Sequence, residues 1–380
     1  MNSYRVGGSV RDELLGLPVV DRDYVVVGST PEEMVSLGYK PVGKDFPVFL
    51  HPQSREEYAL ARTERKVARG YKGFKIHAAP DVTLEQDLER RDLTINAMAR
   101  DEAGRLIDPF GGATDLERGL LRHVSPAFVE DPVRILRVAR FAARFGFAVA
   151  PGTMALMRSM VENGEADALV PERVWLEFSR GLMEGDPGLM FPVLAQSGLL
   201  ARLLPELKVE FKHGRPANDA ARVLIRALQC AASERLGLAP RFALLASRTG
   251  SAGAARAVSE RLKAPGDCRE LALLAERHAG TIERVAVLGA AELLGLLERC
   301  DAFRRPERFG DLLALAECLE RGEKGWGETP YMPRAILMRA LGAATGVDAG
   351  RIAARSAKAD IAAKLRLARI AAIEKLARNR

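Results

Sequence analysis

The sequence predicts an α+β fold, in which an N-terminal domain of strands and helices precedes an entirely helical remainder. Short β-branched apolar runs, punctuated by Gly and Pro, crowd the first third of the chain, as strands of a sheet do. From about Ser125 onward, apolar residues recur every three or four positions, which is the period of a helix. The length of 380 residues allows two or three domains, and 48% hydrophobic residues with 28% charged ones exclude a disordered chain.

The predicted elements follow this change of pattern in order. Strands are expected at residues 4–6, 19–27, 47–50, 58–60 and 106–107. Helices are expected at residues 133–145, 154–161 and 173–182. No repeat of about 20 to 50 residues indicates a solenoid. We therefore expect domains at residues 1–125, 126–205 and 206–380.

Hydropathy and cysteine usage both indicate an intracellular protein. No apolar run reaches the roughly 18 to 20 residues of a membrane helix, and residues 1–4 do not begin a secretory signal. We expect a protein that stays in the cytoplasm. Its cysteines are far apart and lack metal-ligand spacing, so we expect reduced thiols in the core. They are Cys230, Cys268, Cys300 and Cys318.

The net charge of +7 is concentrated at the end of the chain. Residues 351–380 contain nine basic and two acidic residues, an excess equal to that of the whole protein. Apolar residues from Ile361 to Leu376 recur at helical spacing in the same stretch, which predicts a basic amphipathic helix. Such a helix is either a solvated surface or a contact for the phosphate backbone of a nucleic acid.

A Gly-Gly turn follows the first predicted strand. Gly7 and Gly8 precede a short helical stretch, which Ser9 and Asp12 are expected to start. Glycines let backbone N–H groups approach a ligand closely, and helix N-termini favour anions. The turn is a candidate triphosphate cradle with Arg11 as its cationic partner, although a Gly-Gly turn alone is more often only a turn.

Two carboxylates lie in the second predicted strand. Residues i and i+2 of an extended strand point to the same face, so Asp21 and Asp23 are expected side by side. Paired carboxylates repel each other unless a cation neutralises them, and paired Mg²⁺ ions serve the displacement of pyrophosphate from a nucleotide. The alternative is two exposed acids on an edge strand. The flanking valines and the preceding Gly-Gly turn favour the metal site.

A third motif, at residues 90–97, combines arginines with short polar side chains. Arginines such as Arg91 suit phosphate oxygens, and Asp92 and Asn96 suit ribose hydroxyls. A charged helix end is the alternative interpretation.

A fourth motif, at residues 130–140, begins the first helix of the remainder. Asp131 and Arg134 can share a face and would offer the acceptor and donors that a base edge requires, while Arg137 and Arg140 could reach phosphates. Taken alone, the pair is better explained as an i,i+3 salt bridge.

Taken in this order, the motifs resemble those of the class II tRNA nucleotidyltransferases, the CCA-adding enzymes, in their bacterial branch. The resemblance extends from Tyr4 to about Phe178. The matching segments are residues 7–12, 21–23, 43–51, 57–66, 90–97, 111–112, 130–140 and 171–175.

This resemblance implies a polymerase β-like nucleotidyltransferase head, followed by a helical neck, body and tail, and it implies tRNA, CTP and ATP as substrates. Asp21 and Asp23 would hold Mg²⁺, with Glu57 as a third catalytic carboxylate. The nucleotide-binding residues would be Gly8, Arg11, Arg91, Arg137 and Arg140 for the phosphates and Asp92 and Asn96 for the ribose.

The resemblance also assigns nucleotide selection. Asp131 and Arg134 resemble the amino-acid template that selects CTP and then ATP. Residues 62–75 resemble the flexible loop that this family uses for the switch to ATP.

One departure concerns a His-Asp phosphohydrolase domain that some bacterial relatives carry after the neck. After residue 200 the chain has only His213 and His278 and no His-Asp pair, so we expect neither the insertion nor its hydrolytic activity. Residues 209–347 match the family poorly.

Two rival functions remain. Bacterial poly(A) polymerases have the same head but usually carry paired basic residues before a Phe, where this chain has Gly43-Lys44-Asp45-Phe46. A non-catalytic RNA-binding homologue is disfavoured because Asp21 and Asp23 are intact.

Overall fold

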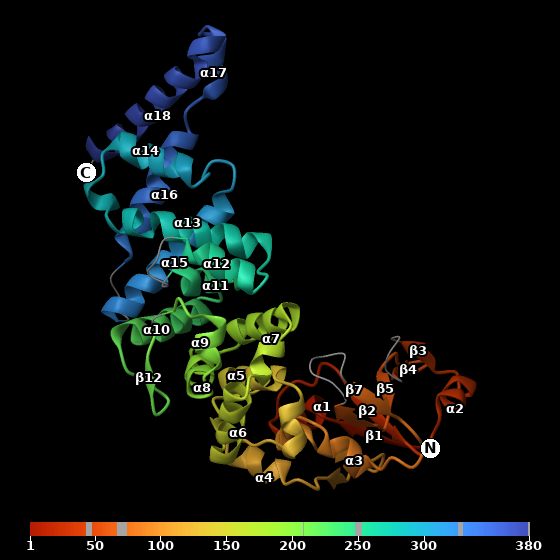
Figure 1. Ribbon diagram of the computed structural model, residues 1–380. Coiled ribbons are helices and arrows are strands. Elements are labelled where there is room, and N and C mark those ends of the chain that lie inside the picture. The colour runs from red at the N-terminus through yellow and green to blue at the C-terminus, as the bar shows by residue number, and fades with distance from the viewer. Residues whose placement is uncertain (43–47, 67–73, 208, 248–252, 326–329, 379–380) are drawn as a thin grey trace. The chain divides into compact units, whose positions relative to one another are not determined.

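The computed structural model describes residues 1–378 apart from 43–47, 67–73, 208, 248–252 and 326–329 (Figure 1). The chain forms two compact units. The first comprises Met1–Gly181 and Leu189–Arg202, and the second comprises Leu182–Gly188 and Leu203–Arg380. The predicted α+β class is confirmed, because strands form a sheet in the first unit and helices dominate the rest.

A seven-stranded sheet organises the N-terminal part of the first unit. Its strand order is β3-β4-β5-β2-β1-β8-β9, and within it β2 and β5 run parallel whereas the other neighbours are antiparallel. The strands are β1 (Asn2–Val6), β2 (Asp23–Val27), β3 (Lys40–Val42), β4 (Val48–Leu50), β5 (Glu57–Leu60), β8 (Ala99–Arg100) and β9 (Leu106–Ile107).

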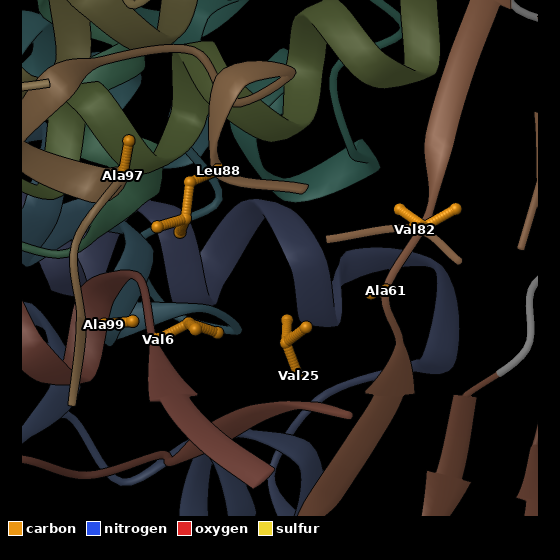
Figure 2. Close-up of a cluster of buried hydrophobic side chains, with 7 residues drawn as sticks. All are labelled: Val6, Val25, Ala61, Val82, Leu88, Ala97 and Ala99. Atoms are coloured by element: carbon orange, nitrogen blue, oxygen red, sulfur yellow. The ribbon is translucent and has the colours of Figure 1, made fainter. Parts of the chain in front are cut away.

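Each face of this sheet carries its own apolar cluster, because side chains alternate along a strand. Val25 packs with Val6, Leu88 and further residues on one face, which Figure 2 shows. Val26 packs with Met34 and aromatic residues on the other. By the same alternation, Asp23 lies on the face of Val25.

The second predicted strand is too long. Residues 19–22 precede β2, which begins at Asp23 opposite Val6. The physical reason is the turn at Gly7, whose φ is +70°, because β1 leaves the sheet there and offers β2 no further partner. The predicted strands at 4–6, 58–60 and 106–107 are confirmed, and that at 47–50 is confirmed for Val48–Leu50, since residue 47 lies outside the described residues.

The remaining elements of the first unit are short strands and helices. The two-stranded sheets pair β6 (Thr63–Lys66) with β7 (Phe74–His77) and β10 (Leu120–Leu121) with β11 (Ala148–Val149). The first helices are α1 (Gly8–Leu14), α2 (Pro31–Ser36), α3 (Leu84–Glu89), η2 (Thr94–Asn96), α4 (Gly112–Glu117) and η3 (Pro126–Glu130). They are followed by α5 (Val133–Phe145), α6 (Pro151–Glu162), η4 (Glu165–Ala168), α7 (Pro171–Met183), α8 (Met190–Gln196) and α9 (Leu199–Leu203). The last residues of α7 and α9 and most of η5 (Pro187–Leu189) are assigned to the second unit.

Three of these helices confirm the helices predicted at residues 133–145, 154–161 and 173–182. Helix α5 has an apolar face that packs against α8 and buries Ile135, Leu136 and Val138 completely. It ends at Gly146, which adopts the left-handed conformation with φ of +70° that glycine accepts without strain. Arg134, Arg137 and Arg144 of α5 are only partly buried, whereas Arg140 is buried.

The second unit is helical, apart from a hairpin of β12 (Phe211–Lys212) and β13 (Arg215–Pro216). Its core pairs α10 with α15 so closely that a Cβ on Gly322 would lie 2.7 Å from the carbonyl oxygen of Val223. The helices are α10 (Asp219–Ser233), α11 (Leu238–Ser247), α12 (Ala254–Arg261), α13 (Gly266–Glu283), η6 (Val285–Val287), α14 (Ala290–Arg299), α15 (Pro306–Lys324), α16 (Met332–Thr345), α17 (Ala349–Ala354), η7 (Lys358–Asp360) and α18 (Ile361–Arg378).

Two predictions for this unit are confirmed. All four cysteines are buried free thiols. The basic segment forms helix α18, which packs on α14 and α16 through Ile373 and half-buried neighbours such as Leu365. Among the described residues, no helix is long and apolar enough to cross a membrane. The domain boundaries at 125 and 205 stay predictions.

Candidate active site

The turn after β1 is shaped around an arginine. A Cβ on Gly7 would lie 2.8 Å from Nη1 of Arg91, so glycine is what allows this guanidinium to rest on the turn. The predicted start of α1 is wrong in detail. Gly7 is the N-cap without a side-chain cap, and Ser9 lies inside the helix, where its hydroxyl donates to the carbonyl of Val6 at 3.0 Å.

Arg91 is held from behind by a buried carboxylate. Asp87, which is fully buried in α3, forms ion pairs with Arg90 at 2.6 Å and with Arg91 at 3.2 Å. Burial alone would raise the pKa of Asp87, but the two guanidinium groups lower it overall. Nε of Arg91 is itself buried and has no hydrogen-bond partner among the described residues. A guanidinium N–H that lacks a hydrogen-bond partner, in a residue that rests on a glycine turn, suits an anionic ligand.

Three carboxylate residues lie at or just before the first positions of β2 and β5. Asp23 and Glu57 are register partners at the first positions of these parallel strands. Asp21 lies two residues before β2 and still acts on Asp23 electrostatically. Desolvation raises the pKa of Asp23, Arg91 opposes this, and the charge of Asp21 raises the pKa further.

This donor set consists of oxygen ligands that repel each other, which is the chemistry that a hard divalent cation relieves. Within the described residues, however, no three His, Cys, Asp or Glu side chains are already grouped to hold a metal ion. The charge of Asp21 thus reaches Asp23, but the described residues contain no ready site with Glu57 as a third ligand, and the metal site stays a prediction.

Arg11, predicted to contact a triphosphate, is embedded in the protein. Its guanidinium donates to Asp12 at 2.8 Å and to Asn96 at 2.5 Å, and it lies about 5 Å from the ring centroids of Phe141 and Phe145. Burial lowers its pKa, which Asp12 opposes. Arg11 therefore joins α1 to α5, and its contact with phosphate stays a prediction.

Asp92 is the centre of a buried hydrogen-bond network. Its carboxylate accepts from the Asn96 amide at 3.0 Å and from Nε of Arg137 at 2.7 Å. Burial alone would raise its pKa, but Arg137 and the hydrogen bonds lower it strongly, and Asp92 in turn raises the pKa of Arg137. Asp92 and Asn96 are each 6% exposed, so they hold neighbouring side chains in place by buried hydrogen bonds. Their contact with a ribose stays a prediction.

The network continues into α7 through Glu177. This buried carboxylate accepts from Nε of Arg140 at 2.7 Å and lies 3.6 Å from Nη1 of Arg137. The two arginines predicted to contact phosphates are therefore aligned by one carboxylate on a neighbouring helix. A chain of contacts thus extends from Arg11 through Asp92 to Glu177.

The predicted template pair lies where α5 begins. Asp131 accepts from the backbone N–H of Val133 at 3.2 Å and from both terminal nitrogens of Arg173 at 3.1 and 2.7 Å. Arg134 donates to the carbonyl oxygen of Arg90 at 2.6 Å and lies 6.0 Å from the ring centroid of Phe128. Both side chains are held by neighbours, and their reading of a base stays a prediction.

Sequence reasoning assigned no role to three supporting residues, Asp87, Arg173 and Glu177, although Arg173 lies in the matching segment 171–175. A signal existed for each. Asp87 precedes Arg90 and Arg91 by three and four residues, which is the spacing of ion pairs on a helix, and Arg173 and Glu177 lie one turn apart.

Two of the predicted motifs lie partly or wholly outside the described residues. Most described residues of the predicted flexible loop at 62–75 belong to strands β6 and β7, which pair as an antiparallel hairpin, whereas residues 67–73 lie outside the described residues. Residues 43–47, which distinguish the rival poly(A) polymerase, also lie outside them.

Two family models match the chain. The Poly A polymerase head domain matches residues 3–122, and the probable RNA and SrmB-binding site of polymerase A matches residues 146–211. The crystal structure of the Bacillus stearothermophilus CCA-adding enzyme in complex with CTP has a TM-score of 0.68 at 23% identity, covering 98% of this chain and 89% of that one. The Thermotoga maritima CCA-adding enzyme complexed with tRNA has a TM-score of 0.61 at 24% identity, covering 96% and 90%. These structures share the fold.

Curated relatives are much more similar in sequence. A multifunctional CCA protein from Azoarcus sp. (strain BH72) is 54% identical over 401 residues, covering 99% of this chain and 97% of the relative. Another, from Nitrosomonas europaea, is 54% identical over 376 residues, covering 93% and 91%. With this identity over nearly the whole length, the chain belongs to the family of bacterial CCA-adding enzymes, the tRNA nucleotidyltransferases.

Proposed function

We propose that this enzyme adds C, C and A to the 3′ end of tRNA without a nucleic-acid template, using CTP and ATP and releasing pyrophosphate. The observation that carries the proposal is the position of Arg91. It rests on the Gly7 turn, retains an orphaned Nε, and acts on the charge of Asp23. Arg91 would thus bind a phosphate close to the proposed carboxylate pair, Asp21 and Asp23, as nucleotidyl transfer requires.

In this mechanism the chain's own residues bind and orient the nucleotide. The Gly8 backbone with Arg11 and Arg91 would bind the triphosphate, and Arg137 and Arg140, aligned on α5, would add phosphate contacts. Asp92 and Asn96 would hold Arg137 and Arg11 in place through their hydrogen bonds and would contact the ribose. The 3′ hydroxyl of the tRNA would then attack the α-phosphorus in line, and pyrophosphate would leave.

Membership of the nucleotidyltransferase family implies use of a divalent metal, and we propose Mg²⁺ held by Asp21 and Asp23. The all-oxygen donor set fits this ion. When bound, it would lower the pKa of the attacking hydroxyl and stabilise the leaving pyrophosphate. Glu57, the register partner of Asp23, is the third carboxylate of this proposal.

Base selection is proposed for Asp131 and Arg134. Cytosine and adenine both present an exocyclic amino group, which can donate a hydrogen bond to a carboxylate. Uracil and guanine present a carbonyl oxygen at the same position. An acceptor at Asp131 therefore favours C and A, and the donors of Arg134 suit the adjacent ring nitrogen.

The substrate tRNA would also contact the basic tail. In α17 and the following segment, Arg351, Arg355 and Lys358 are exposed and form no ion pair with the described residues, whereas Arg366 in α18, also exposed, pairs with Glu298 at 3.4 Å. These three unpaired residues would neutralise phosphates of the tRNA. For an enzyme that processes tRNA in this way, we propose a location in the cytoplasm.

Incubation of a tRNA lacking its CCA end with labelled CTP and ATP tests the proposal. We expect two C residues with CTP alone, no stable addition with ATP alone, and a completed CCA end with both. A poly(A) polymerase would instead extend many RNAs with ATP alone, and a non-catalytic homologue would incorporate neither nucleotide.

A further inference from the structure

We propose that Arg173 is a positioning residue for nucleotide selection, which holds the Asp131 carboxylate so that a single acceptor faces the incoming base. The inference rests on the proposed function, because it takes Asp131 as a residue that reads the base.

The ion pair between these residues has a rigid geometry. Two parallel N–H donors of Arg173 meet the two carboxylate oxygens of Asp131 at 3.1 and 2.7 Å. The side chains are 31% and 20% exposed, so the pair is partly shielded from water. A bidentate guanidinium fixes a carboxylate in orientation as well as in position, which a single hydrogen bond does not.

Helix α7 anchors Arg173 firmly. Val174 and Phe178 on the same helix are 3% and 0% exposed. One turn after Arg173, Glu177 aligns Arg137 and Arg140. The same helix therefore orients both the acceptor that would read the base and the arginines that would bind phosphates.

The hydrogen bonds at Asp131 can be counted. A carboxylate has about four acceptor positions. Oδ1 accepts from Val133 N–H and from Nη1 of Arg173, and Oδ2 accepts from Nη2 of Arg173. Among the described residues no other donor to this carboxylate is found, so one acceptor position remains, on Oδ2.

One remaining acceptor matches what the substrates present. The amino groups of cytosine and adenine can donate to it, whereas the carbonyl oxygens of uracil and guanine would meet it with repulsion. If Arg173 were absent, the carboxylate could rotate and take up water, and this repulsion would be relieved. Arg173 therefore increases the discrimination against UTP and GTP through its ion pair with Asp131 and does not itself contact the nucleotide.

The test measures kcat/KM for CTP and UTP on a tRNA lacking its CCA end. A base contact is worth a factor of about 5 to 150 in discrimination, so Arg173→Ala should lower the CTP-to-UTP ratio at least about fivefold. Arg180→Ala is the matched control, because it removes the same charge from an exposed position on the same helix. It should leave the ratio unchanged.

A double-mutant cycle distinguishes positioning from a general structural role. If Arg173 acts through Asp131, then Arg173→Ala should cause no further loss of selectivity in an Asp131→Ala background. Arg173→Lys, which keeps the charge but not the two parallel bonds, should give an intermediate ratio, and it carries the test if the alanine variant does not fold.

An unchanged ratio in folded Arg173→Ala or Arg173→Lys would overturn the inference, as would an equal further loss in the Asp131→Ala background. Failure of the unaltered enzyme to add C or A would instead refute the proposed function. The two failures are therefore distinguishable.

Discussion

Replacement of Asp92 perturbs the centre of the buried network. Its carboxylate accepts from Arg137 at 2.7 Å, from the backbone N–H of Leu93 at 2.8 Å and from Asn96 at 3.0 Å. Asp92→Asn can keep the two neutral donors on its oxygen, but it turns an amide donor toward the guanidinium of Arg137. Asp92→Ala loses all three contacts.

The structure sets the size of these effects. One hydrogen bond to a charged group contributes about 1.5–3 kcal/mol, so Asp92→Asn should lower the free energy of unfolding by that amount. Asp92→Ala should cost about 3–5 kcal/mol, as expected when one partner of a buried pair is removed. The control is Asp167→Asn, whose carboxylate is 65% exposed beside Arg202 and whose loss should cost less than about 1 kcal/mol.

The same carboxylate predicts a dependence on pH. Because the pKa of Asp92 is lowered in the folded protein, its stabilising contribution is complete above the unfolded pKa of about 3.9 and is lost as the pH falls toward the folded value. The gap in stability between the unaltered protein and Asp92→Asn should therefore be constant from neutral pH to about pH 5. It should narrow below about pH 4.

Urea unfolding followed by tryptophan fluorescence measures both effects. The chain has two tryptophans, and in a Trp326→Phe background the signal comes from Trp175 in α7, within the first unit. A loss below 1 kcal/mol in Asp92→Ala, or a gap that does not change between pH 7 and pH 3, would refute the assignment of Asp92 as an ionised buried partner of Arg137.

Three further predictions concern activity and binding. Asp21→Ala or Asp23→Ala should abolish incorporation of both C and A while tRNA binding persists, and near-normal activity in either variant would contradict the metal site. Replacing Arg351, Arg355 and Lys358 by Gln should weaken tRNA binding and reduce the slope of log affinity against log salt by about 0.9 per lost phosphate contact, with the KM for CTP unchanged. The purified protein should not hydrolyse 2′,3′-cyclic nucleotides in the presence of metal ions, and hydrolysis that copurifies with the chain would show the expectation to be wrong.

Local patterns predicted much of the fold. The periodicity of α5 and the glycine turn at residue 7 are properties of short segments, and the structure confirms both. The start of β2 was mispredicted because residues 19–22 have strand-like composition, whereas strand length depends on where the partner β1 ends. A partner's end is set by tertiary pairing, which composition does not contain.

The site divides in the same way. Residues such as Arg91, Asp92 and Arg137 belong to short motifs and could be singled out from the sequence. The pairing of Asp92 with Arg137 joins positions 45 residues apart, and that of Asp131 with Arg173 joins positions 42 apart. The sequence offers Arg137 and Arg173 several carboxylates as possible ion-pair partners. Only the packing of α5 and α7 determines which carboxylate each arginine contacts.

The most direct test of the central claim, selection of nucleotides by side chains, is kcat/KM for all four nucleotides in single variants of α5. Arg134→Ala should accept UTP or GTP more readily relative to CTP, because a base contact worth about 1–3 kcal/mol is lost while phosphate contacts remain. Arg137→Ala and Arg140→Ala should slow all nucleotides about equally. An equal loss for every nucleotide in Arg134→Ala, with the preference for CTP intact, would contradict the template.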